Sequence, residues 1–66
     1  MTIMLNNESR ETQAQTIAAL AHELDAAAPG RLVFERNGIA VPPSQWEHTP
    51  LADGDRVEVL KISAGG

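Results

Sequence analysis

The sequence predicts an α+β fold in which a mixed sheet of four to five strands carries one helix across one face. Two observations lead to this prediction. Most apolar residues alternate with polar ones in short runs bounded by turn residues, which is typical of strands, whereas residues 16–24 repeat their apolar positions at helical spacing. Because one helix cannot cover both faces of a sheet, we expect the other face to meet solvent or a partner.

The chain begins with a predicted pair of strands. Residues 2–6 are rich in strand formers, with Ile3 and Leu5 on one face and Met4 on the other. Two consecutive asparagines follow, and they suit a tight turn because asparagine tolerates positive φ. Residues 9–13 then return as a mostly polar second strand, and this polarity predicts an edge position.

The helix is predicted from four apolar residues at positions i, i+3, i+4 and i+7, namely Ile17, Leu20, Ala21 and Leu24. Thr16 is a candidate N-cap, and Thr12 with Gln15 forms a rival capping pair. We expect the helix to end near residues 26–28, because Pro29 cannot continue it and Gly30 permits a reversal.

A second hairpin is predicted in the middle of the chain. Leu32 and Phe34 alternate with Val33 and Glu35, and the run stops at an Asn-Gly pair, a strong hairpin signal. Residues 39–41 form the return strand, which two consecutive prolines terminate.

The segment after the prolines predicts a short helical turn. Ser44 and Glu47 have the spacing of a capping box, and the turn holds Trp46, which we expect to act as a lid on a small core. An Asp-Gly-Asp turn at residues 53–55 then leads into the last strand, residues 56–62.

Alternation in the last strand assigns its two faces. Val57 and Val59 share the core side, whereas Leu60 and Ile62 lie outward. We expect these two outward residues to lie beside Met4. Together the three would form a partner-binding patch next to the start of the C-terminal tail. The predicted core comprises Ile3, Leu5, Ile17, Leu20, Leu24, Leu32, Phe34, Leu51, Val57 and Val59.

The predicted element order is strand, strand, helix, strand, strand, short turn and strand. If the first and last strands pair in parallel at the centre, this is the order of a β-grasp, or ubiquitin-like, fold. Residues 1–62 would form the domain, and residues 63–66 a flexible C-terminal tail that ends in Gly-Gly.

Composition excludes several classes of function. A net charge of -4 argues against nucleic acid as a partner, because phosphate binding needs a basic patch. No apolar run approaches the roughly 20 residues that span a bilayer, and the N-terminus lacks a signal-peptide pattern, so we expect no membrane contact and a cytoplasmic location. The chain has no cysteine and its two histidines have no spaced partner, so no metal site is predicted.

The last four residues, Ser63, Ala64, Gly65 and Gly66, indicate chemistry at the C-terminal carboxylate. Glycine lets a backbone enter a narrow cleft without Cβ contacts. A carboxylate is a poor electrophile until it is converted to an acyl-adenylate. The chain has no Gly-rich phosphate loop leading into a helix, so ATP would belong to a partner. Gly66 would be the reacting end, and the other three residues the arm that the partner binds.

Taken together, several motifs resemble the ThiS family of sulfur-carrier proteins of thiamine biosynthesis. They are Asn37-Gly38, Val41-Pro42, Trp46, Leu51-x-Asp53-Gly54-Asp55-x-Val57-Glu58 and Gly65-Gly66. The terminal Gly-Gly alone is shared by every ubiquitin-like modifier, but the combination is fairly specific and spans nearly the whole chain. One departure is that Asn6-Asn7 stands where Asn-Gly is more usual.

The resemblance implies a carrier and protein substrate, not an enzyme. A ThiF-type adenylyltransferase would use ATP and magnesium to adenylate Gly66, and a sulfur donor system such as a cysteine desulfurase would convert the terminus to a thiocarboxylate. Thiazole synthase (ThiG) would then accept the sulfur. The chain itself would bind no cofactor, and we expect it to be a monomer on its own.

Two alternatives remain open at this level. The small subunit of molybdopterin synthase also has a β-grasp fold and a terminal Gly-Gly. A protein modifier or plain binding module, or a carrier for another pathway, would have the same architecture.

Overall fold

The computed structural model of the chain describes residues 1–62. The elements in chain order are β1 (Thr2–Leu5), β2 (Glu8–Glu11), α1 (Ile17–Leu24), η1 (Pro29–Arg31), β3 (Leu32–Arg36), β4 (Ile39–Val41), η2 (Pro43–His48) and β5 (Arg56–Lys61), where η1 and η2 are 3-10 helices. The predicted tail, residues 63–66, lies outside the described residues, so its division from the domain stays a prediction.

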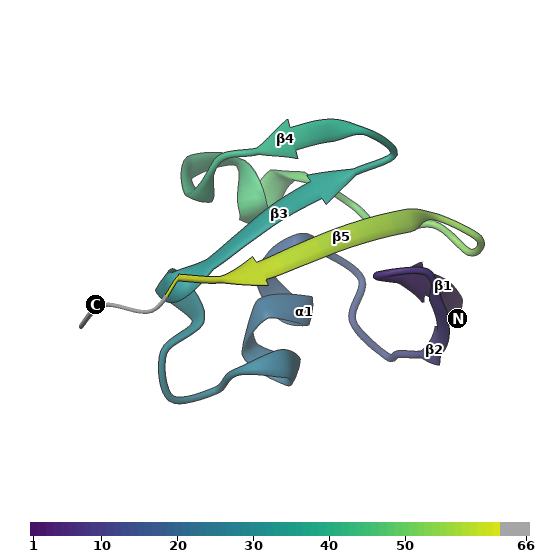
Figure 1. The fold of residues 1–66 in the computed structure, drawn as a ribbon, viewed down its shortest axis with the longest axis horizontal. Helices are drawn as coiled ribbons and strands as arrows, with labels where there is room; N and C mark the ends of the chain where they lie inside the picture. Colours follow the sequence, from purple (N-terminus) through teal and green to yellow (C-terminus); the bar gives the residue numbers. More distant parts are fainter. Residues whose placement is uncertain (63–66) are drawn as a thin grey trace.

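The strands form one five-stranded sheet in the order β2-β1-β5-β3-β4. The two central strands, β1 and β5, are parallel, with Met4 opposite Arg56 and Leu5 opposite Val57, and every other pair is antiparallel. Figure 1 shows α1 on one side of this sheet. The predicted β-grasp fold is confirmed, as is the edge position of the polar strand β2.

The core lies between the sheet and α1. Its largest fully buried side chains are Ile3, Ile17, Leu20, Phe34 and Val57. Leu5, Leu24 and Val59, also predicted there, are half-buried against it.

Trp46 closes the η2 side of this core. Its ring packs edge-on against Phe34, with centroids 5.3 Å apart. Its indole Nε1–H donates to the carbonyl of Val41 at 3.0 Å, so the polar atom of the buried ring is satisfied. The prediction that Trp46 is a lid on the core is confirmed.

The two predicted hairpin turns have the backbone that their residues favour. Asn6, Asn7, Asn37 and Gly38 all have positive φ. Asn6 does more than turn the chain: its side-chain amide donates to the carbonyl of Val59 at 3.1 Å, and its Oδ1 accepts the Val59 N–H at 2.8 Å. The asparagine side chain therefore continues the β1–β5 ladder past the end of β1.

The helix begins as predicted and ends earlier. Thr16 is the N-cap, and its hydroxyl accepts the N–H of Ala19 at 3.1 Å. The predicted end is near residues 26–28, and α1 stops two residues earlier, at Leu24. Asp25 leaves helical geometry, and its Oδ1 accepts the N–H of Ala28 at 3.1 Å, which replaces a further turn of helix with a side-chain turn.

The predicted capping box at Ser44 is also wrong. The helical turn exists, but its N-cap is Pro42, and Ser44 lies inside the turn. Pro43 occupies the start of η2, where a missing N–H costs nothing, and the first backbone bond runs from the Gln45 N–H to the Pro42 carbonyl at 2.8 Å. The fixed φ of proline therefore starts this turn without a side-chain cap.

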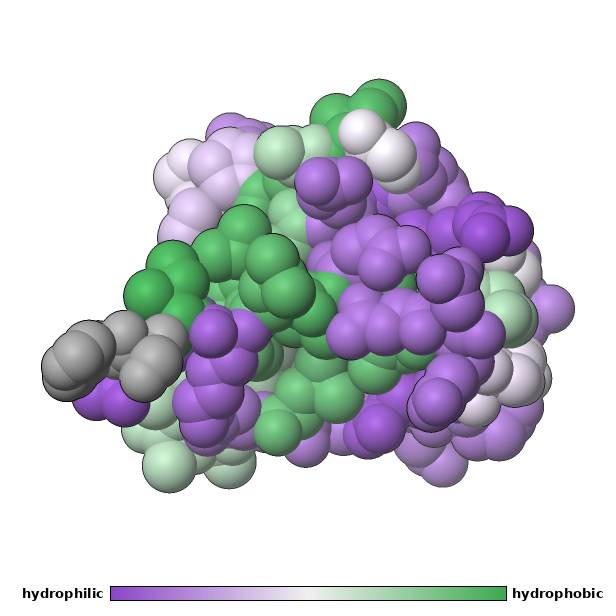
Figure 2. All heavy atoms as spheres, viewed as in Figure 1, coloured by the Kyte–Doolittle hydropathy of each residue, from purple (hydrophilic) through white to green (hydrophobic). Residues whose placement is uncertain are grey.

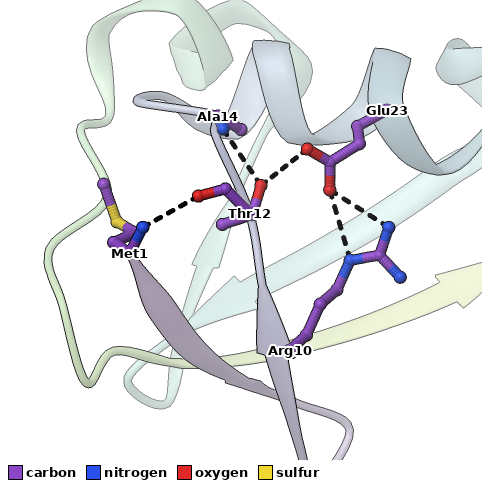
Figure 3. A network of polar contacts seen from close by, with 5 residues as sticks. All are labelled: Met1, Arg10, Thr12, Ala14 and Glu23. Atoms are coloured by element: carbon purple, nitrogen blue, oxygen red, sulfur yellow. Dashed lines mark hydrogen bonds and ion pairs between the residues drawn. The ribbon is translucent and has the colours of Figure 1, made fainter.

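A polar network ties the edge strand β2 to the helix (Figure 3). The Glu23 carboxylate accepts from the Thr12 hydroxyl at 2.7 Å and from the Arg10 guanidinium at 3.1 Å. These bonds, that from Thr12 first, hold the pKa of Glu23 below its usual value. The N-terminal amine of Met1 donates to the carbonyl of Thr12 at 3.0 Å. The polar residues of β2 were predicted only to suit an exposed edge. The structure shows that Arg10 of this strand also binds it to the helix.

A second network centres on Asp55, which is 8% exposed. Burial by itself raises the pKa of its carboxyl, but hydrogen bonds from the Ala52 N–H, Arg36 and Asn37 outweigh it, so the net shift is downward. The Arg36 Nε–Oδ2 distance is 2.8 Å. Asp55 thereby joins the turn before β5 to the end of β3.

The two caps give a matched stability test. Thr16→Ala should lower the free energy of unfolding by about 1 kcal/mol, because it removes a side-chain cap. Ser44→Ala should change it by less than about 0.5 kcal/mol, because Ser44 caps nothing. Urea unfolding followed by circular dichroism measures both. Equal losses in the two variants would contradict the assignment of the caps.

The Asp55 network predicts a pH dependence of stability. The pKa of the Asp55 carboxyl is lower in the folded state than in the unfolded state. The network therefore adds to the free energy of unfolding above the unfolded-state pKa, near 3.9, and this contribution is lost as the pH falls through the folded-state pKa. Asp55→Asn should lower the free energy of unfolding by about 1–3 kcal/mol at pH 7 and flatten its decline in acid. Glu47→Gln, at an exposed carboxylate, is the control and should keep the wild-type slope. A wild-type slope in Asp55→Asn would contradict the prediction.

Candidate functional site

The end of β5 is where the predicted site begins. Leu32 lies opposite Lys61 in the β3–β5 pair, and one residue further the N–H of Ile62 donates to the carbonyl of Arg31 at 2.8 Å. The sheet therefore holds the chain as far as Ile62, the last described residue.

An ion pair also connects the end of β5 to the end of the helix α1. The Lys61 ammonium lies 2.7 Å from Asp25 Oδ2. Asp25 follows the end of α1 and is largely covered, with 14% of its side chain exposed, whereas Lys61 is 58% exposed. Hydrogen bonds from Lys61 and from the Ala28 N–H hold the pKa of Asp25 below its usual value, so the carboxylate is charged at neutral pH.

The sheet face opposite the helix carries an apolar patch at this end. Leu60 is 72% exposed, Ile62 56% and Val33 45%, and Val33 lies directly opposite Leu60 across the β3–β5 pair. Figure 2 shows apolar surface near the end of β5, while the opposite end of the molecule is mostly hydrophilic. We call Val33, Leu60 and Ile62 the docking patch. The predicted outward orientation of Leu60 and Ile62 is confirmed.

The prediction that Met4 lies beside these residues is wrong. Met4 is on the same face but pairs with Arg56, four positions before Leu60 along β5. At about 3.3 Å per residue, the two lie roughly 13 Å apart along the strand. Met4 is also half-buried. Val33, and not Met4, is the neighbour of Leu60. Alternation along β3 predicts that Val33 points outward, but only the strand register shows that it lies next to Leu60.

Two carboxylates border the docking patch. Glu35 and Glu58 lie directly opposite each other in the β3–β5 pair, on the same face as Val33 and Leu60 and two residues from them along each strand. Like charges in directly opposed positions destabilise a sheet. A partner that brings a cationic group to this position would relieve the repulsion.

The remaining predicted site residues, Ser63, Ala64, Gly65 and Gly66, lie outside the described residues. The chain's length still limits their reach. Four residues span at most about 14 Å when fully extended. Any group that acts on the carboxylate of Gly66 must therefore come within about 14 Å of Ile62, close to the docking patch.

Residues 1–62 contain neither a membrane-spanning helix nor a cluster of metal-ligating side chains. None of the helices there is long and apolar enough to cross a membrane. In the same range, no three His, Cys, Asp or Glu side chains gather closely enough to hold a metal ion.

Comparisons with known proteins agree on one family. A sequence model of the ThiS family matches residues 3–66. The sulfur carrier protein ThiS of Escherichia coli K12 is 31% identical over 67 aligned residues, with all of both chains covered. The crystal structure of the thiamine biosynthesis protein ThiS from Geobacter metallireducens matches with a TM-score of 0.79 at 26% identity, again over all of both chains. The family model and the Escherichia coli relative both cover this chain as far as Gly66.

Proposed function

The chain belongs to the ThiS family, and we propose that it is a sulfur carrier protein of thiamine biosynthesis. Gly66 is adenylated by a partner and converted to a thiocarboxylate, which donates its sulfur for thiazole formation. The observation that carries this proposal is the family match, which runs through the terminal Gly-Gly over the whole chain.

In the proposed chemistry the partners supply the ATP, the magnesium and the sulfur, so the carrier supplies only its C-terminal carboxylate. In adenylation the Gly66 carboxylate attacks the α-phosphorus of ATP and pyrophosphate leaves. A sulfur nucleophile then attacks the carbonyl carbon of the acyl-adenylate and expels AMP. We assign ATP and magnesium to a ThiF-type adenylyltransferase, and the sulfur to a donor system such as a cysteine desulfurase. Thiazole synthase (ThiG) is the proposed acceptor. The chain has no cysteine, which suits a cargo that travels on the terminal acyl group.

The docking patch is the proposed contact with these partners. Its three apolar side chains are exposed at the base of the arm formed by Ser63, Ala64 and Gly65, so a protein that covers them also receives the carboxylate. The Glu35–Glu58 pair and the net charge of -4 favour a partner surface with an apolar centre and basic residues beside it.

Intact mass tests the proposal. The chain is co-expressed with a ThiF-type adenylyltransferase and a sulfur donor system, and a mass gain equal to one oxygen replaced by sulfur is expected. Thiazole formation with purified thiazole synthase then distinguishes thiamine biosynthesis from molybdopterin synthesis. Attachment of the chain to lysines of other proteins would instead indicate a modifier.

Deletion of Gly66 should abolish sulfur loading. The thermal unfolding midpoint should stay nearly unchanged, because residues 1–62 contain the whole described core. Intact mass and differential scanning calorimetry measure the two properties. Sulfur loading of the truncated chain would rule out the terminal-acyl mechanism.

Leu60→Asp should weaken binding to the adenylyltransferase at least tenfold, which is about 1.4 kcal/mol, and should change the free energy of unfolding by less than about 0.5 kcal/mol. Ile39→Asp is the matched control, since Ile39 is similarly exposed, at 71%, but lies on the edge strand β4. Isothermal titration calorimetry measures the affinity. If the two variants bind with equal affinity, the docking patch is not part of the interface.

A further inference from the structure

The chain contains one lysine, Lys61, and it lies five positions before the reacting end, Gly66. The only other amine is the N-terminus, which donates to the Thr12 carbonyl. Figure 1 places the N-terminus at the opposite end of the molecule from the end of β5. Lys61 is therefore the one amine of the chain that is near the base of the arm.

This amine is a hazard for the proposed chemistry. An acyl-adenylate reacts with amines as well as with sulfur. The lone pair of a neutral Lys61 Nζ would attack the Gly66 carbonyl carbon, a C–N bond would form, and the bond to AMP would break with AMP as leaving group. The amine proton would pass to water. The product, an amide within one chain or between two copies, could not carry sulfur.

Two features of β5 keep the amine from this reaction. First, alternation turns Lys61 toward the helix side, whereas Leu60 and Ile62 point to the docking face. Second, Asp25 Oδ2 lies 2.7 Å from the ammonium. This contact holds the amine beside the end of α1, on the side of the sheet away from the docking patch.

The position of the Asp25 carboxylate is itself fixed. Its Oδ1 accepts the Ala28 N–H at 3.1 Å, which leaves Oδ2 for Lys61. Most of the Asp25 side chain is covered, so its charge is less screened than that of a surface carboxylate. Asp25 is thus held in place to bind the lysine before any partner arrives.

We propose that the Asp25–Lys61 ion pair sequesters the chain's only lysine from the activated C-terminus and so suppresses self-acylation. The inference rests on the proposed activation of Gly66. It assigns Asp25 a protective role that differs from simple stabilisation, because its loss changes the chemistry of Lys61 and not only the stability of the fold.

The first test needs no partner. The whole chain is exposed briefly to the N-hydroxysuccinimide ester of acetic acid, and peptide mass spectrometry gives the ratio of acetylation at Lys61 to that at the N-terminus. Asp25→Asn keeps the shape of the side chain and an oxygen for the Ala28 N–H. It should raise this ratio about two- to fivefold, the range that a partly exposed ion pair supplies. Glu47→Gln should leave the ratio unchanged. An unchanged ratio in Asp25→Asn, with a native circular dichroism spectrum, would overturn the inference.

The second test uses the adenylyltransferase with ATP and magnesium but no sulfur donor. Asp25→Asn should accumulate a species lighter by one water, or a dimer lighter by one water, with Lys61 joined to Gly66. The double variant Asp25→Asn/Lys61→Arg should not, because guanidinium is a poor nucleophile at neutral pH. If adenylate forms but Asp25→Asn cross-links no more than wild type, the inference is wrong and the proposed function stands. If no adenylate forms in wild type, the proposed function fails and the inference fails with it.

Discussion

The parallel pairing of β1 with β5 is the constraint on which the rest of the structure depends. Backbone bonds run from the Gly54 N–H to Thr2, from the Met4 N–H to Asp55 and from the Asn6 N–H to Val57, all at 2.8–2.9 Å. They join the two ends of the chain at the centre of the sheet, where side chains from both are fully buried. A parallel pair needs a long connection, and here that connection supplies α1 and the β3–β4 hairpin. As a result, the chain leaves the domain from a well-supported central strand.

Strand β5 serves two purposes because its side chains alternate. Val57 and Val59 pack toward the core, and Lys61 on the same side reaches Asp25. Leu60 and Ile62 remain exposed on the other side. A substitution on the exposed face is therefore expected to leave the packing of the core face largely intact.

Three carboxylates connect elements that are distant in the sequence. Asp55 joins the turn before β5 to β3, Glu23 joins β2 to α1, and Asp25 joins the helix end to β5. Each carboxylate has a lowered pKa, so each is charged at neutral pH. A cysteine-free chain keeps these connections without introducing a thiol that could compete for the acyl group.

The sequence by itself determined the elements, the turns, the two faces of β5 and the family, because these depend on local periodicity, on residues that tolerate positive φ, and on motifs at fixed spacing. It also predicts chemistry at the C-terminal carboxylate, and that prediction concerns residues outside the described range. It could not determine register, since alternation fixes the face of a residue but not its neighbour on a distant strand; hence Val33, and not Met4, lies beside Leu60. The Asp25–Lys61 pair was likewise decided only by the tertiary structure, which brings together residues 36 positions apart.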